Sequence, residues 1–218
     1  MVVYYLKFNY LSYTFLSTLG EFSSDMMRDI REEQNVRVDQ EDLNTYKSLN
    51  KEQRAGFDEI MHHVKDRKSQ VFFIDCPGGT GKIFLYKALL AKVRLEGLIA
   101  IATATSGIAE SLLPGGRTAH SRFKIPIKLG DHSMCNFTKQ SGTAELLRMA
   151  SLIIWDEAAM TKHQAVETLD RSLQDIMDST LPFGVKVMLF GGCRYPVGGI
   201  PTPTAARQDP HGHPRLTP

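Results

Sequence analysis

A glycine-rich segment at residues 76–83, Cys-Pro-Gly-Gly-Thr-Gly-Lys-Ile, constrains the fold more than any other part of the chain. An apolar run over 71–75 precedes it and predicts a buried strand, while apolar residues at helical spacing over 82–96 predict a helix after it. Glycines between a strand and a helix leave backbone amides free to surround a phosphate, which the helix N-terminus also attracts. The segment therefore predicts a phosphate-binding loop in which Gly78, Gly79 and Gly81 free the backbone and Lys82 contacts the terminal phosphates.

Two positions of this loop depart from the usual P-loop pattern, in which glycine opens the loop and Ser or Thr follows the lysine. Ile83 stands where a hydroxyl would ligate magnesium, and Cys76 stands at the first glycine. By analogy with removing one transition-state contact, loss of the hydroxyl predicts a rate ~10²- to 10³-fold lower. Cys76 would add roughly 1–2 kcal/mol of strain if its backbone needs a positive φ. Its thiol is either activated by the helix N-terminus and Lys82 or of ordinary reactivity.

A second candidate feature is the acidic pair Asp156-Glu157, which follows the apolar run 151–155. Carboxylates at the carboxyl end of a sheet strand suit a magnesium-holding acid and a base that activates water. Asp-Glu after a strand is also a common helix cap, as a glycine-rich turn is often only a turn. Because the two features occur together and in this order, they favour a nucleotide-binding origin.

Four short apolar runs alternate with longer segments of helical spacing, a pattern typical of βαβ units and a mostly parallel α/β sheet. The runs cover 71–75, 98–103, 151–155 and 185–190. Asn50 is a candidate N-cap for the helix that carries Phe57, Ile60 and Val64.

The chain divides into three predicted parts. Residues 1–48 form a loosely attached helical extension, 49–192 form the α/β domain, and the proline-rich segment 193–218 is a disordered tail. The longest uncharged run near the N-terminus, 8–20, is too short and too polar to span a bilayer, so no membrane association is expected.

Charge and cysteine content exclude some classes of site. The net charge is +2 overall and sums to zero before residue 193, so a nucleic-acid interface would have to rest on local residues. The three cysteines form no CxxC pair, which argues against a zinc site or a disulfide framework.

Six motifs, taken in order over about residues 49–192, resemble the Pif-type superfamily 1 DNA helicases, and in particular those carried by Helitron-like mobile elements. The motifs are Leu49-Asn-Lys-Glu-Gln53, Pro77-Gly-Gly-Thr-Gly-Lys82, Ala102-Thr-Ala-Thr-Ser-Gly-Ile-Ala109, Arg117-Thr-Ala-His-Ser-Arg-Phe123, Ile154-Trp-Asp-Glu-Ala158 and Pro182-Phe-Gly184.

The resemblance implies a RecA-like P-loop NTPase domain with helices on both faces of its sheet. It also implies hydrolysis of ATP with Mg²⁺, coupled to 5′-to-3′ movement along single-stranded DNA. The family serves DNA repair, recombination and telomere maintenance, which implies a location in the nucleus or in mitochondria. ATP and single-stranded DNA would be the partners.

Carried over by position, the resemblance also assigns roles to individual residues. Gln53 would read the adenine, and Asp156 and Glu157 would be the magnesium-side carboxylate and the base that orients the attacking water. The phosphate cradle would comprise Gly79, Thr80, Gly81 and Lys82, and the DNA contacts would be Thr105, Ser106, Gly107, His120 and Phe123. Hydroxyls and free amides suit DNA phosphates and an aromatic ring suits an unpaired base, but Phe123 could equally be a core residue and His120 a structural histidine.

The chain departs most from the family after Gly192. Cys193 and Pro196 occupy the positions of the family's Asp and Gln, and we expect residues 1–218 to lack the family's second motor domain with its arginine. We therefore expect that this polypeptide alone does not unwind DNA, and that a frameshift or mispredicted exon boundary follows Gly192. The alternative function is a non-catalytic nucleotide- or DNA-binding remnant of a mobile-element helicase.

Overall fold

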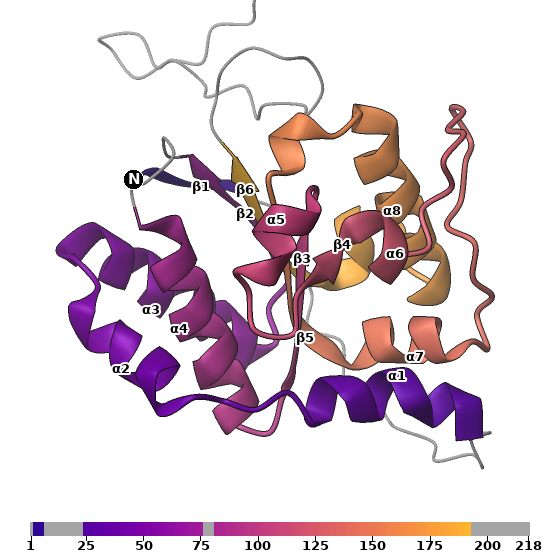
Figure 1. The fold of residues 1–218 in the computed structure, drawn as a ribbon. Coiled ribbons are helices and arrows are strands. Elements are labelled where there is room, and N and C mark those ends of the chain that lie inside the picture. The colour runs from indigo at the N-terminus through magenta and orange to yellow at the C-terminus, as the bar shows by residue number, and fades with distance from the viewer. Residues whose placement is uncertain (1, 7–23, 76–80, 193–218) are drawn as a thin grey trace, which may run out of the picture.

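The computed structural model describes residues 2–6, 24–75 and 81–192, and its core is a six-stranded sheet in the order β1-β2-β6-β5-β3-β4 (Figure 1). All neighbouring strands are parallel except β1 and β2, which are antiparallel. The mostly parallel sheet predicted from the alternating pattern is therefore confirmed. The strands are β1 (Val2–Leu6), β2 (Gln70–Asp75), β3 (Ile99–Ala104), β4 (Arg117–Thr118), β5 (Ala150–Asp156) and β6 (Val187–Gly192).

Helices cover both faces of this sheet, as expected for the predicted α/β fold (Figure 1). One face carries α2 (Gln40–Ser48), α3 (Lys51–Asp66) and α4 (Lys82–Leu95), and the other carries α6 (Ala119–Arg122), α7 (Gly142–Met149) and α8 (His163–Ile176). The remaining elements are α1 (Ser24–Gln34), α5 (Gly107–Ser111) and the 3₁₀ turns η1 (Ala158–Met160) and η2 (Pro182–Val185).

The core consists of two apolar clusters, one on each face of the sheet. Successive residues of β5 alternate between them, because side chains of a strand point to opposite faces: Ile153 and Trp155 join one cluster and Ile154 the other. Burial on both faces explains why the strands read as continuous apolar runs in the sequence.

The start of α3 follows the sequence prediction closely. The Asn50 side chain accepts a hydrogen bond from the Gln53 amide at 2.8 Å, and the Gln53 side chain accepts one from the Asn50 amide at 3.0 Å. This reciprocal capping box fixes Gln53 at the first turn of the helix.

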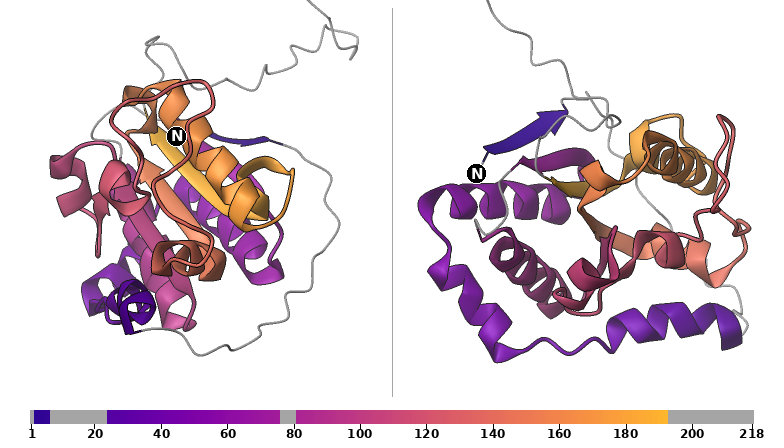
Figure 2. Two further views of the ribbon diagram at one scale, coloured as in Figure 1. Left: turned by 90° about the vertical axis from the view of Figure 1, so that its right-hand side faces the viewer. Right: turned by 45° about the horizontal axis from the view of Figure 1, so that its top comes forward.

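The expectation that residues 1–48 attach loosely is wrong for the part that the structure describes. Val2–Leu6 form a strand rather than a helix. Helix α1 packs beside α7 and lies at the bottom of the molecule in the view of Figure 1, and it is the indigo helix at the bottom of both views in Figure 2. The α1 residue Glu33 is buried and forms ion pairs with Arg94 of α4 and Arg122 of α6. A buried carboxylate between two buried guanidinium groups anchors the helix, because separating them would leave charges without partners.

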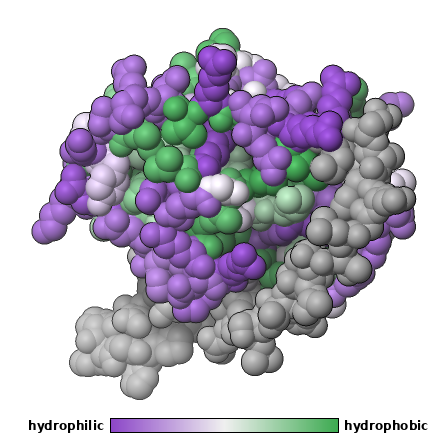
Figure 3. All heavy atoms as spheres, turned by 90° about the horizontal axis from the view of Figure 1, so that it is seen from below, coloured by the Kyte–Doolittle hydropathy of each residue, from purple (hydrophilic) through white to green (hydrophobic). Residues whose placement is uncertain are grey.

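No helix among the described residues is long and apolar enough to cross a membrane. The face seen from below mixes hydrophilic side chains with separate apolar groups (Figure 3).

Candidate functional site

An ion pair joins the two predicted halves of the site. Lys82 Nζ, at the start of α4, lies 2.8 Å from Asp156 Oδ1 at the end of β5. The Asp156 side chain is only 3% exposed and that of Lys82 is 17% exposed, so the contact is largely shielded from water. Because β6 lies between β2 and β5, Lys82 and Asp156 meet across the carboxyl end of an intervening strand.

Two residues that the sequence analysis did not single out shape this contact. The Tyr86 hydroxyl donates to the same Asp156 Oδ1 at 3.3 Å, and its side chain is fully buried. A Cβ on Gly191 of β6 would overlap the Tyr86 hydroxyl and would lie 2.5 Å from Asp156 Oδ1. Only glycine therefore lets Tyr86 reach Asp156 across β6. Two features of the sequence could have identified these residues. Tyr86 follows Lys82 by four positions, which places both on one helix face, and Gly191 belongs to the Gly-Gly pair that ends the strand.

The described end of the predicted phosphate loop has a conformation that requires glycine. Gly81 has φ +81°, and a Cβ there would lie 2.9 Å from Gln53 Nε2. Gln53 also donates from Nε2 to the Gly81 carbonyl at 3.4 Å, so the capped start of α3 contacts the start of α4. This contact places the predicted adenine-reading residue beside the predicted phosphate loop. Cys76, Gly78, Gly79 and Thr80 lie outside the described residues, as do Cys193 and Pro196.

Ile83 is partly buried and packs against the apolar cluster that α3 and α4 share. The position that would supply a hydroxyl ligand thus contributes to packing instead. Among the described residues, no group of three or more His, Cys, Asp or Glu could hold a metal ion.

Glu157 follows Asp156 with a left-handed backbone, φ 55°, which is uncommon for a residue other than glycine. Two hydroxyls hold it in place. Thr105 Oγ1 donates to the Glu157 carbonyl at 2.8 Å and accepts from Trp155 Nε1 at 3.1 Å. Ser106 Oγ donates to Glu157 Oε2 at 2.6 Å. The predicted base is therefore fixed by two residues whose predicted role was DNA binding.

The other predicted DNA-binding residues differ in exposure. Gly107 and His120 are exposed and thus open to a ligand. Phe123 is fully buried, and its ring lies 5.8 Å from that of Trp155 in the core. The prediction that Phe123 stacks on a base is therefore wrong for this structure, because no part of the ring reaches solvent. Phe123 is a core residue, which was the alternative prediction.

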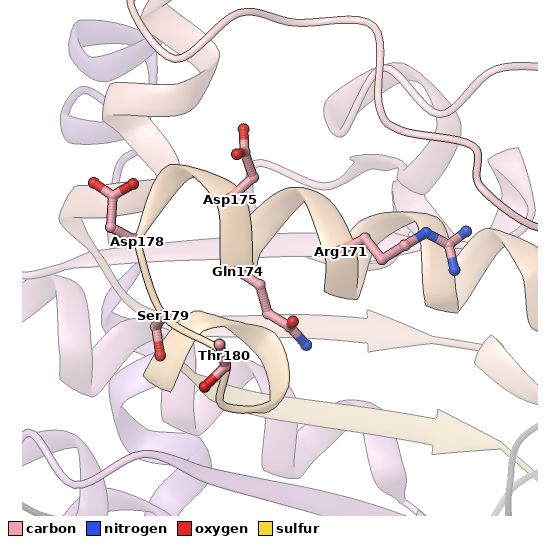
Figure 4. A pocket seen from close by; sticks show the side chains of 6 residues that line it. All are labelled: Arg171, Gln174, Asp175, Asp178, Ser179 and Thr180. Atoms are coloured by element: carbon pink, nitrogen blue, oxygen red, sulfur yellow. The ribbon is translucent and has the colours of Figure 1, made fainter.

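A separate cavity of about 350 Å³ lies at the C-terminal end of α8 (Figure 4). Asp175 and Asp178 line it, and both form ion pairs with Lys139. It shares no residue with the predicted ATP site, and its exposed carboxylates would repel a phosphate.

Comparison with known proteins gives a consistent result. Residues 48–203 match the family described as "PIF1-like helicase". The chain is 33% identical over 112 residues to the ATP-dependent DNA helicase PIF3 of Trypanosoma brucei brucei, covering 51% of this chain and 13% of that protein. It is 32% identical over 126 residues to PIF1 of the same organism, covering 57% of this chain and 12% of that protein.

Solved structures of Pif1 helicases share the fold. Pif1 from Bacteroides in complex with ADP-AlF3 and single-stranded DNA superposes with a TM-score of 0.54 at 28% identity, covering 68% of this chain and 34% of that one. The structure of two coordinating Pif1 helicases at forked double-stranded DNA gives a TM-score of 0.56 at 28% identity, and the match covers 71% of this chain and 36% of that one. These matches confirm the predicted RecA-like architecture. The chain spans about an eighth of the curated relatives and about a third of the solved chains.

Proposed function

The chain belongs to the PIF1-like helicase family, and from that premise we propose that it is the first motor domain of an ATP-dependent DNA helicase. In this proposal residues 49–192 form the motor domain, residues 1–48 precede it and 193–218 follow it. The curated relatives are named as ATP-dependent DNA helicases. We also propose that the protein acts in the nucleus or in mitochondria.

The contact between Lys82 and Asp156 carries this proposal. A lysine at the start of a helix and a carboxylate at the end of a strand, 2.8 Å apart, can both face one triphosphate. When ATP binds, Lys82 would give up its ion pair with Asp156 and contact the phosphates instead. Gln53, beside Gly81, would contact the adenine. Glu157, at the end of the same strand, would orient the attacking water.

Magnesium fits this donor set through Asp156, because Mg²⁺ in such sites takes one or two carboxylates together with phosphate oxygens. When bound, the ion neutralises charge that develops on the transferring phosphate. Ile83 supplies no oxygen, so this chain would hold the ion with one side-chain ligand fewer than the family pattern.

Single-stranded DNA is the proposed second partner. Ser106, Gly107 and His120 are at least partly exposed. Ser106 and Gly107 follow β3, the neighbour of the β5 strand that ends just before Glu157, and His120 follows β4 on the other side of β3. Their hydroxyl, amide and imidazole groups suit backbone phosphates. Pif1 from Bacteroides, one of the structures with the same fold, was solved bound to single-stranded DNA, which supports this assignment.

A non-catalytic remnant that binds nucleotide or DNA is the second candidate, and the packing of Ile83 against the core favours it. Titration with a fluorescent ATP analogue, with and without Mg²⁺, together with phosphate release, separates the two. A working ATPase binds more tightly with Mg²⁺ and releases phosphate. A remnant binds equally well without Mg²⁺ and releases none. Loss of binding in Lys82→Ala is expected for both, and unchanged binding in that variant contradicts both.

Residues 1–218 cover about a third of the solved Pif1 chains, and a second motor domain would supply an arginine to the ATP site, so these residues alone are not expected to unwind DNA. An arginine supplied in this way contributes ~10³- to 10⁵-fold in related P-loop enzymes. Efficient unwinding of a forked duplex by the purified chain would contradict this part of the proposal.

A further inference from the structure

The single proton of the Ser106 hydroxyl is already used in a hydrogen bond to Glu157. The hydroxyl donates to Glu157 Oε2 at 2.6 Å and accepts from the Ala109 amide at 3.2 Å. A serine hydroxyl has a single proton to donate. Phosphate oxygens only accept hydrogen bonds, so a nucleic-acid phosphate can take a hydrogen bond from Ser106 Oγ only if Glu157 gives that bond up.

Thr105 differs from Ser106 in this respect. Its hydroxyl donates to the Glu157 carbonyl and accepts from Trp155 Nε1, and its amide donates to the Asp156 carbonyl at 3.1 Å. These contacts fix the backbone of the acidic pair whether or not a ligand is bound. The backbone of Glu157 is thus held by Thr105, while its side chain is held by Ser106.

We propose that Ser106 is a positioning residue that links nucleic-acid binding to the Glu157 carboxylate. In the free protein Ser106 restrains Glu157 through Oε2. When a backbone phosphate of single-stranded DNA accepts the Ser106 proton, the carboxylate is released to turn toward the nucleotide. Because Thr105 keeps the backbone fixed, only side-chain torsions of Glu157 need to change. This inference rests on the proposed function.

Such coupling must be reciprocal. If phosphate and Glu157 compete for one proton, removing the carboxylate makes nucleic-acid binding tighter. Removing Ser106 makes the two sites independent. The coupling can therefore be measured by binding alone, without any ATP turnover.

The test is a double-mutant cycle with the full chain and a fluorescent oligodeoxythymidine of about 16 nucleotides, followed by fluorescence anisotropy. We expect Glu157→Ala to bind about tenfold more tightly than the wild type, the scale of one hydrogen bond to a charged group. In the Ser106→Ala background the same change should give a clearly smaller gain, due only to the lost negative charge. Ser106→Thr keeps the hydroxyl and should restore the full gain.

Glu157→Gln is the matched control, since it removes the charge but keeps an oxygen that accepts from Ser106. It should gain less affinity than Glu157→Ala, and thermal melting checks that each variant is folded. Equal gains from Glu157→Ala with and without Ser106 would overturn the coupling while leaving the proposed function intact. If the wild type does not bind the oligonucleotide at low salt, the proposed DNA partner fails, and the coupling fails with it.

Discussion

Lys82 Nζ and Asp156 Oδ1 lie 2.8 Å apart across the end of β6, with the fully buried Tyr86 hydroxyl 3.3 Å from the same carboxylate oxygen. The lysine and the aspartate are 74 positions apart in the sequence. The parallel order of β2, β6 and β5 brings their carboxyl ends to one edge of the sheet, so the two motifs meet there. The contact occupies the Lys82 ammonium in the free protein and keeps it where phosphates are expected.

Restoring the missing hydroxyl at position 83 should increase ATP turnover. Ile83→Thr supplies an oxygen for magnesium, and we expect phosphate release to rise by ~10²- to 10³-fold when Mg²⁺ is present. Ile83→Val is the control, because valine has nearly the shape of threonine without its hydroxyl. A rise in both variants, or in neither, would contradict the assignment of this position.

Gly191→Ala should disrupt the site through Tyr86. The new Cβ would overlap the Tyr86 hydroxyl, and the ring cannot move away because it is fully buried. We expect nucleotide affinity to fall at least about tenfold, since a small misplacement of Lys82 or Asp156 weakens every phosphate contact. Titration with a fluorescent ATP analogue measures this.

Tyr86→Phe provides the matched test, because it removes the hydroxyl that the Cβ would meet. Gly191→Ala combined with Tyr86→Phe should recover part of the lost affinity. If the combined variant binds no better than Gly191→Ala alone, the overlap with Tyr86 is not the cause of the defect.

The sequence predicted β2, β3, β5 and β6, the Asn50 cap and the pairing of Lys82 with Asp156, because each depends on local patterns and on the order of strands. It did not predict the outer strands β1 and β4. It did not predict that Phe123 is buried, since an aromatic residue after a short polar stretch suits a core or a base equally well. The sequence also did not predict that α1 packs against the domain. Glu33 is not part of an apolar pattern, and its partners Arg94 and Arg122 lie far away along the chain. Burial of charged residues is decided by tertiary contacts, which local patterns do not encode.

Glu33 should be essential for stability. Glu33→Ala removes the carboxylate that forms ion pairs with the buried guanidinium groups of Arg94 and Arg122, and burial already lowers the pKa of Arg94 to about 10. We expect the free energy of unfolding in urea to fall by about 3–5 kcal/mol. Asp66→Ala, which breaks the exposed contact with Lys68, serves as the control and should leave the unfolding midpoint unchanged. A small effect of Glu33→Ala would show that α1 is not anchored by this cluster.

Phe123 and His120 should separate stability from DNA binding. Phe123→Leu alters a fully buried ring and should lower stability by about 1 kcal/mol, while the affinity for oligodeoxythymidine stays unchanged. His120→Ala removes an exposed side chain and should have the opposite effects, with weaker binding in anisotropy and unchanged urea unfolding. Weaker DNA binding by a folded Phe123→Leu protein would show that the ring contributes to the DNA interface.

Lys186 should make stability depend on pH. Burial, followed by the nearby Arg148, lowers the pKa of its ammonium from 10.5 to about 8 in the folded state, although Nζ donates to the carbonyls of Arg148 and Ala150. Above about pH 8 the unfolded chain therefore binds more protons than the folded one, so stability rises with pH. Between about pH 7 and 9 the rise should be about 1 kcal/mol in urea unfolding. Lys186→Met removes the titrating group, so the free energy of unfolding of the wild type should rise relative to that of this variant between about pH 7 and 9. A constant difference between the two proteins would show that Lys186 titrates normally.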